Sequence, residues 1–154
     1  MGVIASQRML ESAIGLTWVR ESTALWDAGK QNLVAKAPPG IFDERLRTSA
    51  AGSLVPGEWW RVERSGRTVG YGWMDVVWGD AEILLVTDRE SRNDGVGSFI
   101  LDSLEKEARA RGLAYLYNVV RSTHPDGARV AAWLKRRGFT ESPDGRLLRS
   151  VGTR

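Results

Sequence analysis

The chain contains no cysteine and only one histidine among its 154 residues. These absences exclude a disulfide framework, a thiolate zinc site, a cysteine nucleophile and a histidine-rich metal centre, so we expect no metal cofactor. The chain also lacks an apolar run approaching the roughly 20 residues that span a bilayer. Its N-terminus lacks the basic-then-apolar pattern of a signal peptide. We therefore expect a cytoplasmic protein with no membrane partner.

The composition is that of a globular protein, with 42% hydrophobic and 27% charged residues. We find no internal repeat and no low-complexity linker, and the length suits one compact core, so we expect a single domain over residues 1–154. The net charge is +3. No run of five or six like charges marks a binding tail. Nucleic-acid binding through the basic C-terminal helix is an alternative, but its Arg and Lys residues are dispersed around the helix, so we expect no nucleic-acid partner.

Hydrophobic periodicity predicts alternating strands and helices along the chain. We expect strands over residues 16–20, 59–63, 68–78, 81–87 and 114–120, and helices over residues 24–35, 41–47, 96–111 and 125–137. Short turns join the three central strands, which indicates an antiparallel meander. The strand, helix and strand that follow form a parallel crossover. Phe139 and residues 147–151 supply a final hairpin.

The most informative segment is the polar loop that links a hydrophobic strand to an amphipathic helix, residues 85–98. Gly95 and Gly97 open this helix, whose first-turn N–H groups lack intrahelical partners and carry the positive end of the helix dipole. The glycines let a phosphate approach the backbone, and Arg92 adds a cation. A P-loop is excluded because no lysine follows Gly97. A dinucleotide fingerprint is excluded because its third glycine would fall on Ile100.

Residues 92–97 resemble the Arg/Gln-x-x-Gly-x-Gly/Ala signature of the GCN5-related N-acetyltransferase (GNAT) family. Residues 84–86 are similar to the splayed fourth strand of that family, and residues 133–139 to its second signature, a helix that ends in Gly-Phe. The resemblance covers roughly residues 58–151. It implies an α+β fold: a central, mostly antiparallel twisted sheet of six to seven strands, with a splayed parallel pair and helices on both faces.

By this resemblance the chain binds acetyl-CoA as a co-substrate. The residues implied to hold the pyrophosphate are Arg92, Asn93, Asp94, Gly95, Val96, Gly97 and Ser98. Main-chain groups of Leu85, Val86 and Thr87 would bind the pantetheine arm as an added strand would. The backbone N–H of Val86 would polarise the thioester carbonyl.

The chain departs from the family pattern at the position of the general acid. Many members carry a tyrosine four residues before the Gly of Gly-Phe, where this chain has Leu134, and Gly127 replaces a usual asparagine. Tyr117, Tyr115 and His124 are the candidate substitutes. Each has an alternative structural role, in core packing for the tyrosines and in helix entry for the histidine.

The candidate general base is Glu82, which matches a position where several family members carry an acid. An amine must lose a proton to attack a thioester, and a carboxylate or a water chain accepts it. Asp75 and Asp80 are neighbouring acids, and like charges raise the pKa of a carboxyl group. The alternative is that Glu82 is only a solvated acid at a strand edge.

Seven tryptophans are many for a chain of this length. Trp59 and Trp60 point to opposite faces of their strand by alternation, so at least one of them is expected in the core. The other could wall an acceptor pocket for an aromatic, cationic or apolar amine, since both of these residues, together with Trp73 and Trp78, lie on the two strands expected to border the acceptor cleft. The alternative is that all four only pack the sheet.

The sequence thus predicts an N-acetyltransferase that transfers an acetyl group from acetyl-CoA to a primary amine of a small molecule, peptide or protein. The amine attacks directly in a ternary complex, without a covalent enzyme intermediate. The alternative is a CoA-binding or sensing module with weak or no catalysis, which the missing tyrosine favours. The acceptor, the acyl length and the oligomeric state stay open, a homodimer being one option.

Overall fold

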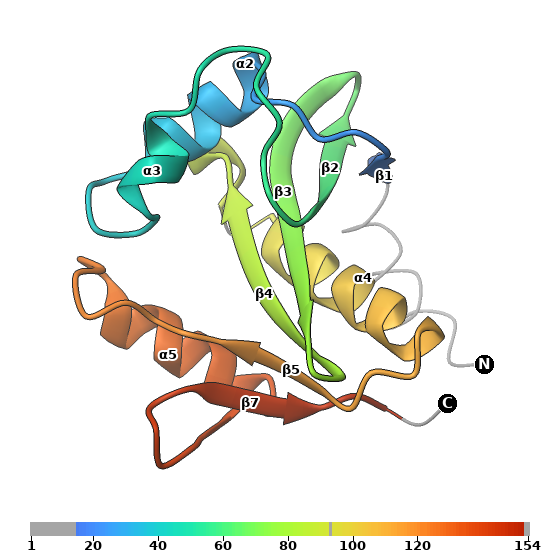
Figure 1. The fold of residues 1–154 in the computed structure, drawn as a ribbon, viewed down its shortest axis with the longest axis vertical. Helices are drawn as coiled ribbons and strands as arrows, with labels where there is room; N and C mark the ends of the chain where they lie inside the picture. Colours follow the sequence, from blue (N-terminus) through green and yellow to red (C-terminus); the bar gives the residue numbers. More distant parts are fainter. Residues whose placement is uncertain (1–14, 93, 153–154) are drawn as a thin grey trace.

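The computed structural model describes residues 15–92 and 94–152, which form a seven-stranded sheet between helices (Figure 1). The strand order is β1-β2-β3-β4-β5-β7-β6. The strands are β1 (Leu16–Glu21), β2 (Glu58–Arg64), β3 (Arg67–Val77), β4 (Asp80–Thr87), β5 (Tyr115–Asn118), β6 (Thr140–Glu141) and β7 (Leu147–Ser150). All neighbouring strands pair antiparallel except β4 and β5, which are parallel. The predicted α+β fold is confirmed.

Helical segments connect the strands. They are α2 (Ala28–Lys30), η1 (Gln31–Ala35), α3 (Glu44–Arg47), η2 (Arg89–Ser91), α4 (Val96–Ala110) and α5 (Gly127–Arg136). None of the helices in the described part of the chain is long and apolar enough to cross a membrane. The long amphipathic helix and both hairpin turns of the meander lie where the periodicity predicts them.

The helix predicted over residues 24–35 begins later than expected. Leu25 forms a β-bridge with Leu54, which holds the chain extended before the helix. Asp27 then caps the helix, its carboxylate accepting a hydrogen bond from the backbone N–H of Lys30 at 2.9 Å. The strand predicted over residues 114–120 is also shorter, because β7 pairs with β5 only as far as Asn118.

Two hydrophobic clusters lie on opposite faces of the sheet. The first packs α4 and α5 against β2–β5, with Trp60, Ile83 and Leu104 fully buried. The second packs α2, η1 and α3 against the other face, where Trp59 is buried beside Tyr71. Trp59 and Trp60 thus lie in different cores, as the alternation along β2 predicts.

A buried ionic network joins α2 to the sheet. The Lys30 ammonium is fully buried and donates to Glu21 Oε1 at 2.6 Å, Asp27 Oδ2 at 3.2 Å and the Leu25 carbonyl at 2.9 Å. Arg61 Nη1 contacts the second Glu21 oxygen at 3.1 Å. Because the charges are paired, this burial is tolerated, whereas removing one partner leaves an uncompensated buried charge.

The substitution Lys30→Met tests this network. We expect it to lower the free energy of unfolding by about 3 kcal/mol, because Glu21 loses its shortest contact in a buried site. Urea denaturation measures the change. Lys36→Met, at an exposed position, is the matched control and should change stability by less than about 0.5 kcal/mol. For Lys30→Met, a loss of unfolding free energy under about 1 kcal/mol, the size of a typical single-site effect, would show that Arg61 alone compensates the charge of Glu21.

Candidate active site

The parallel strands β4 and β5 separate soon after they meet. Among the described residues they pair only at Ala81–Leu116 and Glu82–Tyr117, although β4 continues to Thr87. Asn118, which is buried at the end of β5, donates from Nδ2 to the Ile83 carbonyl at 2.8 Å. This side-chain bond satisfies the first β4 carbonyl beyond the last strand pair. Figure 1 shows the two strands diverging from that point.

Backbone alternation decides which β4 groups face the opening between these strands. The N–H of Asp88 donates to the Val69 carbonyl on the β3 side at 2.8 Å, whereas the Ile83 carbonyl faces the β5 side. In an antiparallel ladder without a bulge, the peptide groups of alternate residues point to the same side, and the β3–β4 register is regular. Leu85 and Thr87 therefore direct their backbone groups to the opening.

The peptide groups of Val86 point instead toward β3. A Cβ built on Gly70 would lie 2.8 Å from the Val86 carbonyl oxygen, which places that oxygen against β3. This geometry argues against the role of thioester polarisation expected for the Val86 N–H. The Val86 side chain faces the cluster beneath α2 and α3. Periodicity could not show this, because it reports side-chain faces and not the partner of each peptide group.

The glycine loop lies where β4 passes into α4. Gly95 has φ of 79°, a left-handed conformation that disfavours any side chain, and it precedes the first residue of α4. No acidic side chain lies in the first turn of α4, so its N–H groups face no competing carboxylate there. Arg92 and Asp94 are exposed in the loop, and Asp94 contacts Arg64 at 3.2 Å. Asn93 lies outside the described residues.

Gly97 and Ser98 contact the C-terminal half of α5. A Cβ on Gly97 would lie 3.6 Å from the Trp133 ring, an ordinary van der Waals distance. The Arg137 guanidinium lies over the Trp133 ring at 4.3 Å and donates to Ser98 Oγ. A cation thus lies beside the N-terminal turn of α4, a contact that the sequence pattern did not predict.

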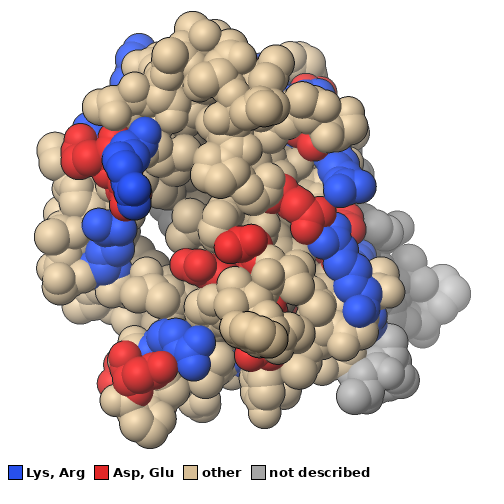
Figure 2. Space-filling model, in the orientation of Figure 1, with Lys and Arg blue, Asp and Glu red and all other residues tan. Residues whose placement is uncertain are grey.

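Two loops meet at the outer end of the opening. Thr123, in the loop between β5 and α5, donates from Oγ1 to the Gly40 carbonyl at 2.7 Å. A Cβ on Gly40 would lie 2.1 Å from the Thr123 carbonyl oxygen, so this close approach requires glycine. Figure 2 shows the opening between the diverging strands, with acidic side chains on one side and basic side chains on the other.

Glu82 lies at the apex of the opening, between an acid and a tyrosine. It pairs with Asp75 on β3 and with Tyr117 on β5. Burial raises the pKa of the Glu82 carboxyl group, and the nearby Asp75 charge raises it further. Burial also raises the pKa of Tyr117, followed by the charge of Glu82, so its phenol stays protonated. The Arg146 guanidinium lies 4.9 Å from the centre of the Tyr117 ring.

The other candidate residues are placed differently. His124 Nδ1 accepts a hydrogen bond from the Asp126 N–H at 2.9 Å, the helix-entry role considered for it. Tyr115 is 44% exposed at the start of β5. Leu134 is 1% exposed and belongs to the core between α4 and α5, so this position has no donor. Of the candidate acids, Tyr117 is the one whose strand partner is Glu82.

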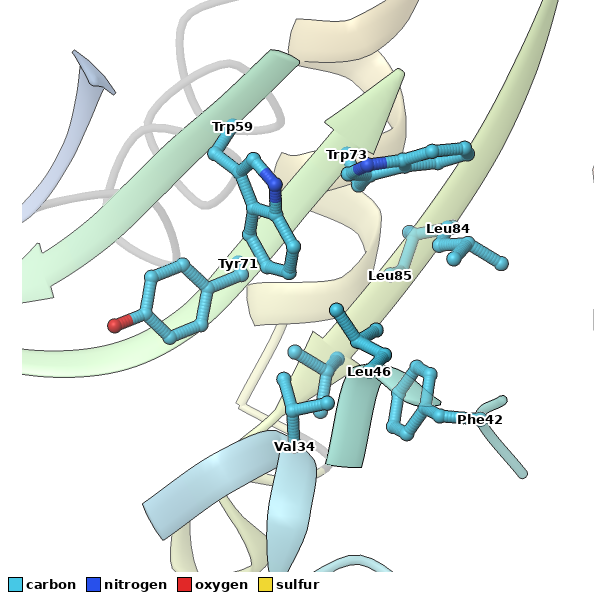
Figure 3. Close-up of a pocket in the computed structure, with 9 residues that line it drawn as sticks. Val34, Phe42, Leu46, Trp59, Tyr71, Trp73, Leu84 and Leu85 are labelled. Atoms are coloured by element: carbon cyan, nitrogen blue, oxygen red, sulfur yellow. The ribbon is translucent and has the colours of Figure 1, made fainter. Parts of the chain in front are cut away.

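An apolar pocket is lined by Leu84 of β4 (Figure 3). Glu82 lies two residues earlier on this strand and therefore shares the face of Leu84. We call this pocket the aromatic pocket, and its lining residues are Val34, Phe42, Leu46, Trp59, Tyr71, Trp73, Leu84, Leu85 and Val86. It is enclosed by β2, β3 and β4 on one side and by the segment from η1 to α3 on the other. Trp59 and Trp73 line this pocket, while Trp78 is 98% exposed at the β3–β4 turn and lines none of it.

A seven-stranded sheet that splays at one parallel pair, with a glycine loop at the next helix, defines a GNAT-like fold. Residues 20–139 match the model of the Acetyltransferase (GNAT) family, and the chain belongs to this family. No curated protein matches the sequence significantly.

Solved structures of acetyltransferases share this fold. The ribosomal-protein-S18-alanine N-acetyltransferase of Escherichia coli aligns with a TM-score of 0.60 and 18% identity, over 89% of this chain and 94% of its own. Ard1 of Thermoplasma volcanium aligns with a TM-score of 0.66 and 17% identity, over 90% and 99%. N-acetylglutamate synthase of Neisseria gonorrhoeae, solved with coenzyme A and L-arginine, aligns with a TM-score of 0.61 and 17% identity, over 88% of this chain and 33% of its own.

The elevated pKa of Glu82 can be tested by titration. We expect carbon-detected NMR to place the pKa of this carboxyl group above the ordinary value of 4.5. Asp75→Asn removes a like charge, so the ionised form costs less and the pKa should fall. The fall should be partial, because burial is the larger cause and remains. Asp102→Asn, on the exposed side of α4, should leave the titration unchanged; no response to Asp75→Asn would contradict the coupling.

Proposed function

We propose that this protein transfers an acetyl group from acetyl-CoA to a primary amine. The observation that carries the proposal is the open edge of β4 beyond Glu82, which leads directly to the glycine loop and the N-terminus of α4. An extended amide-bearing arm fits such an edge as an added strand. An anionic pyrophosphate fits the N–H groups of the helix terminus. One edge therefore suits both parts of coenzyme A.

The fit of the ligand rests on the chain's own groups. The backbone N–H and C=O groups of Leu85 and Thr87 would bind the pantetheine amides, because these groups face the opening. The N–H groups of residues 95–98 would bind the pyrophosphate, with Arg92 and Arg137 as nearby cations. By the same reasoning the Leu85 N–H, in place of the Val86 N–H, would polarise the thioester carbonyl.

The chemistry requires a proton acceptor near the amine. When bound, acetyl-CoA supplies an acetyl group activated as a thioester. The amine nitrogen forms the new C–N bond, the C–S bond breaks, and Glu82 accepts the proton that the nitrogen loses, directly or through a water. Tyr117 lies beside Glu82 with its phenol protonated and would return a proton to the departing sulfur. Transfer of the proton from Glu82 to the Tyr117 oxygen then restores both side chains, and the products are the amide and the thiol.

A second candidate function is coenzyme A binding without efficient catalysis. The observation that favours it is Leu134, an apolar core residue at the position where many family members carry the acid. A thiolate is nevertheless a tolerable leaving group in water, so the loss of one acid lowers the rate without abolishing transfer. Thiol release from acetyl-CoA with a panel of amines separates the two functions. Binding without turnover on any amine would favour the second.

Gly97→Ala tests the proposed phosphate site without disturbing the fold. The protein has room for the added methyl group beside Trp133, so we expect an unchanged or slightly higher melting temperature. We expect acetyl-CoA affinity, measured by calorimetry, to fall at least about tenfold, because each charge-assisted hydrogen bond that is lost costs about 1.5–3 kcal/mol. Ser103→Ala, further along α4, is the control. Unchanged affinity in Gly97→Ala would exclude close approach of the phosphate there.

Glu82→Gln tests the proposed base. We expect kcat/KM for amine acetylation to fall by about a hundredfold or more, because the amide cannot accept a proton. In the wild type, activity should fall as the pH decreases through the elevated pKa of Glu82, since only the carboxylate acts as a base. This limb should vanish in the variant. Glu141→Gln, exposed on β6, should retain both rate and profile; a full rate in Glu82→Gln would assign the base elsewhere.

A further inference from the structure

The aromatic pocket continues the face of the sheet that carries Glu82. Trp73 pairs with Leu84, and Asp75 pairs with Glu82 as the next pair whose side chains share that face. Same-face neighbours on a strand lie two residues, or roughly 7 Å, apart. The acidic pair therefore adjoins the mouth of the pocket. A ligand with a cationic nitrogen and an apolar group a few bonds away would match both.

The polar atoms of the pocket's two indoles are already occupied. Trp59 Nε1 and Trp73 Nε1 both donate to the Pro56 carbonyl, at 2.9 and 3.0 Å. A Cβ on Gly57 would lie 2.1 Å from Trp73 Nε1, so the Trp73 ring lies directly against the backbone before β2. These contacts fix both indole rings, which therefore offer carbon surfaces to a ligand.

The one other polar side-chain group of the lining is the hydroxyl of Tyr71, and its partner lies outside the pocket. Tyr71 packs edge-to-face on Trp59 with ring centres 5.7 Å apart, and its hydroxyl contacts Asp27 Oδ1 at 3.4 Å. Burial raises the pKa of Tyr71, which keeps that hydroxyl protonated. The opposite wall is aliphatic and aromatic, made of Val34, Phe42 and Leu46. A polar group placed here would lose its hydration without gaining a partner.

We propose that the acceptor is a primary amine that carries an aromatic or branched aliphatic group, and that the aromatic pocket binds this group while the ammonium faces Glu82 and Asp75. The inference rests on the proposed acetyl transfer and adds the class of acceptor to it. The space among the lining residues, including its solvent-open part, is about 220 Å³. Much of this space is open to solvent, so the apolar chemistry of the lining, and not the volume, selects the group that binds.

A second hollow in the molecule does not fit the acceptor. It is polar and lies at the edge formed by β1 and the start of α2, and its lining residues are Arg20, Glu21, Ser22, Thr23, Leu25, Asp27 and Arg61. None of these residues belongs to β4 or β5. A ligand there would lie against the ionic network of Lys30, away from the face that Glu82 shares with the aromatic pocket.

The first experiment compares amines that differ in their apolar group. With acetyl-CoA as donor, thiol release gives kcat/KM for 2-phenylethylamine, 3-methylbutylamine, ethanolamine and 1,4-diaminobutane. We expect the two apolar amines to exceed the two polar ones by at least about tenfold, since burying a few methylene equivalents in a fitted pocket yields that ratio. Equal or higher values for ethanolamine or 1,4-diaminobutane would overturn the proposal.

The second experiment removes one wall of the pocket. Trp73→Ala should lower kcat/KM for 2-phenylethylamine by about tenfold or more and leave ethanolamine within about twofold. Trp78→Ala, at an exposed turn, is the matched control and should change neither. Leu46→Ser, on α3 outside the sheet, should repeat the selective loss if Trp73→Ala lowers the melting temperature too far. An equal loss for both amines in the two pocket variants would overturn the proposal.

Binding measurements separate this proposal from the proposed function. Calorimetry of the CoA-loaded protein with 2-phenylethylamine should show saturable binding that Trp73→Ala weakens. Binding without turnover would contradict acetyl transfer and support the assignment of the pocket. Turnover of polar amines without binding of 2-phenylethylamine would support acetyl transfer and contradict the assignment of the pocket. If butyryl-CoA exceeds acetyl-CoA as donor and Trp73→Ala abolishes that preference alone, the pocket binds the acyl chain and the acceptor assignment is wrong.

Discussion

The separation of β4 from β5 after two residue pairs is the constraint on which the rest of the site depends. A parallel strand would normally satisfy the peptide groups of its neighbour along its whole length. Here the Asn118 side chain satisfies the Ile83 carbonyl, and the groups of Leu85 and Thr87 beyond it face open space. A strand edge in the middle of a sheet can bind an extended ligand, because it presents a row of unpaired backbone donors and acceptors.

Both sides of this opening are held by contacts that lie outside it. On one side, Lys30 joins α2 to β1 through Glu21, so the segment that roofs the aromatic pocket is fixed to the far edge of the sheet. On the other side, α5 is held against α4 through Leu134 and the contact between Arg137 and Ser98. Each side of the cleft is thus packed by its own contacts, and the Thr123–Gly40 hydrogen bond joins the two sides at the outer end.

The strand register that ends the β4–β5 pairing also decides which residues surround Glu82, the proposed base. Because the strands part just after Glu82, this residue is the last on β4 with neighbours on both sides, Asp75 and Tyr117. Its half-buried position raises the pKa of the carboxyl group, and the next same-face pair toward the glycine loop is apolar. The acid Glu82, the aromatic pocket and the unpaired backbone groups therefore follow one another along β4. The two-residue period of the strand sets this order.

The amino-acid sequence alone determined the elements and their order. Strand and helix periods predicted the meander, α4 and the division of Trp59 and Trp60 between two cores, because these features depend on local alternation. The glycines at the start of α4 predicted an anion site for the same reason, since a left-handed residue before a helix is a local requirement. Departures arose where distant contacts override local preference, as where the Leu25–Leu54 bridge delays α2.

Only the tertiary structure decided which groups face the cleft. Hydrophobic alternation shows the face of a side chain, but the side to which a peptide group points depends on strand partners, and this moved the expected backbone contact from Val86 to Leu85. The Asn118 side chain bonds to Ile83, 35 residues away. The Arg137 side chain bonds to Ser98, 39 residues away, and the Pro56 carbonyl accepts from Trp73, 17 residues away. Such contacts have no period and leave no local pattern in the chain, so only folding brings them together.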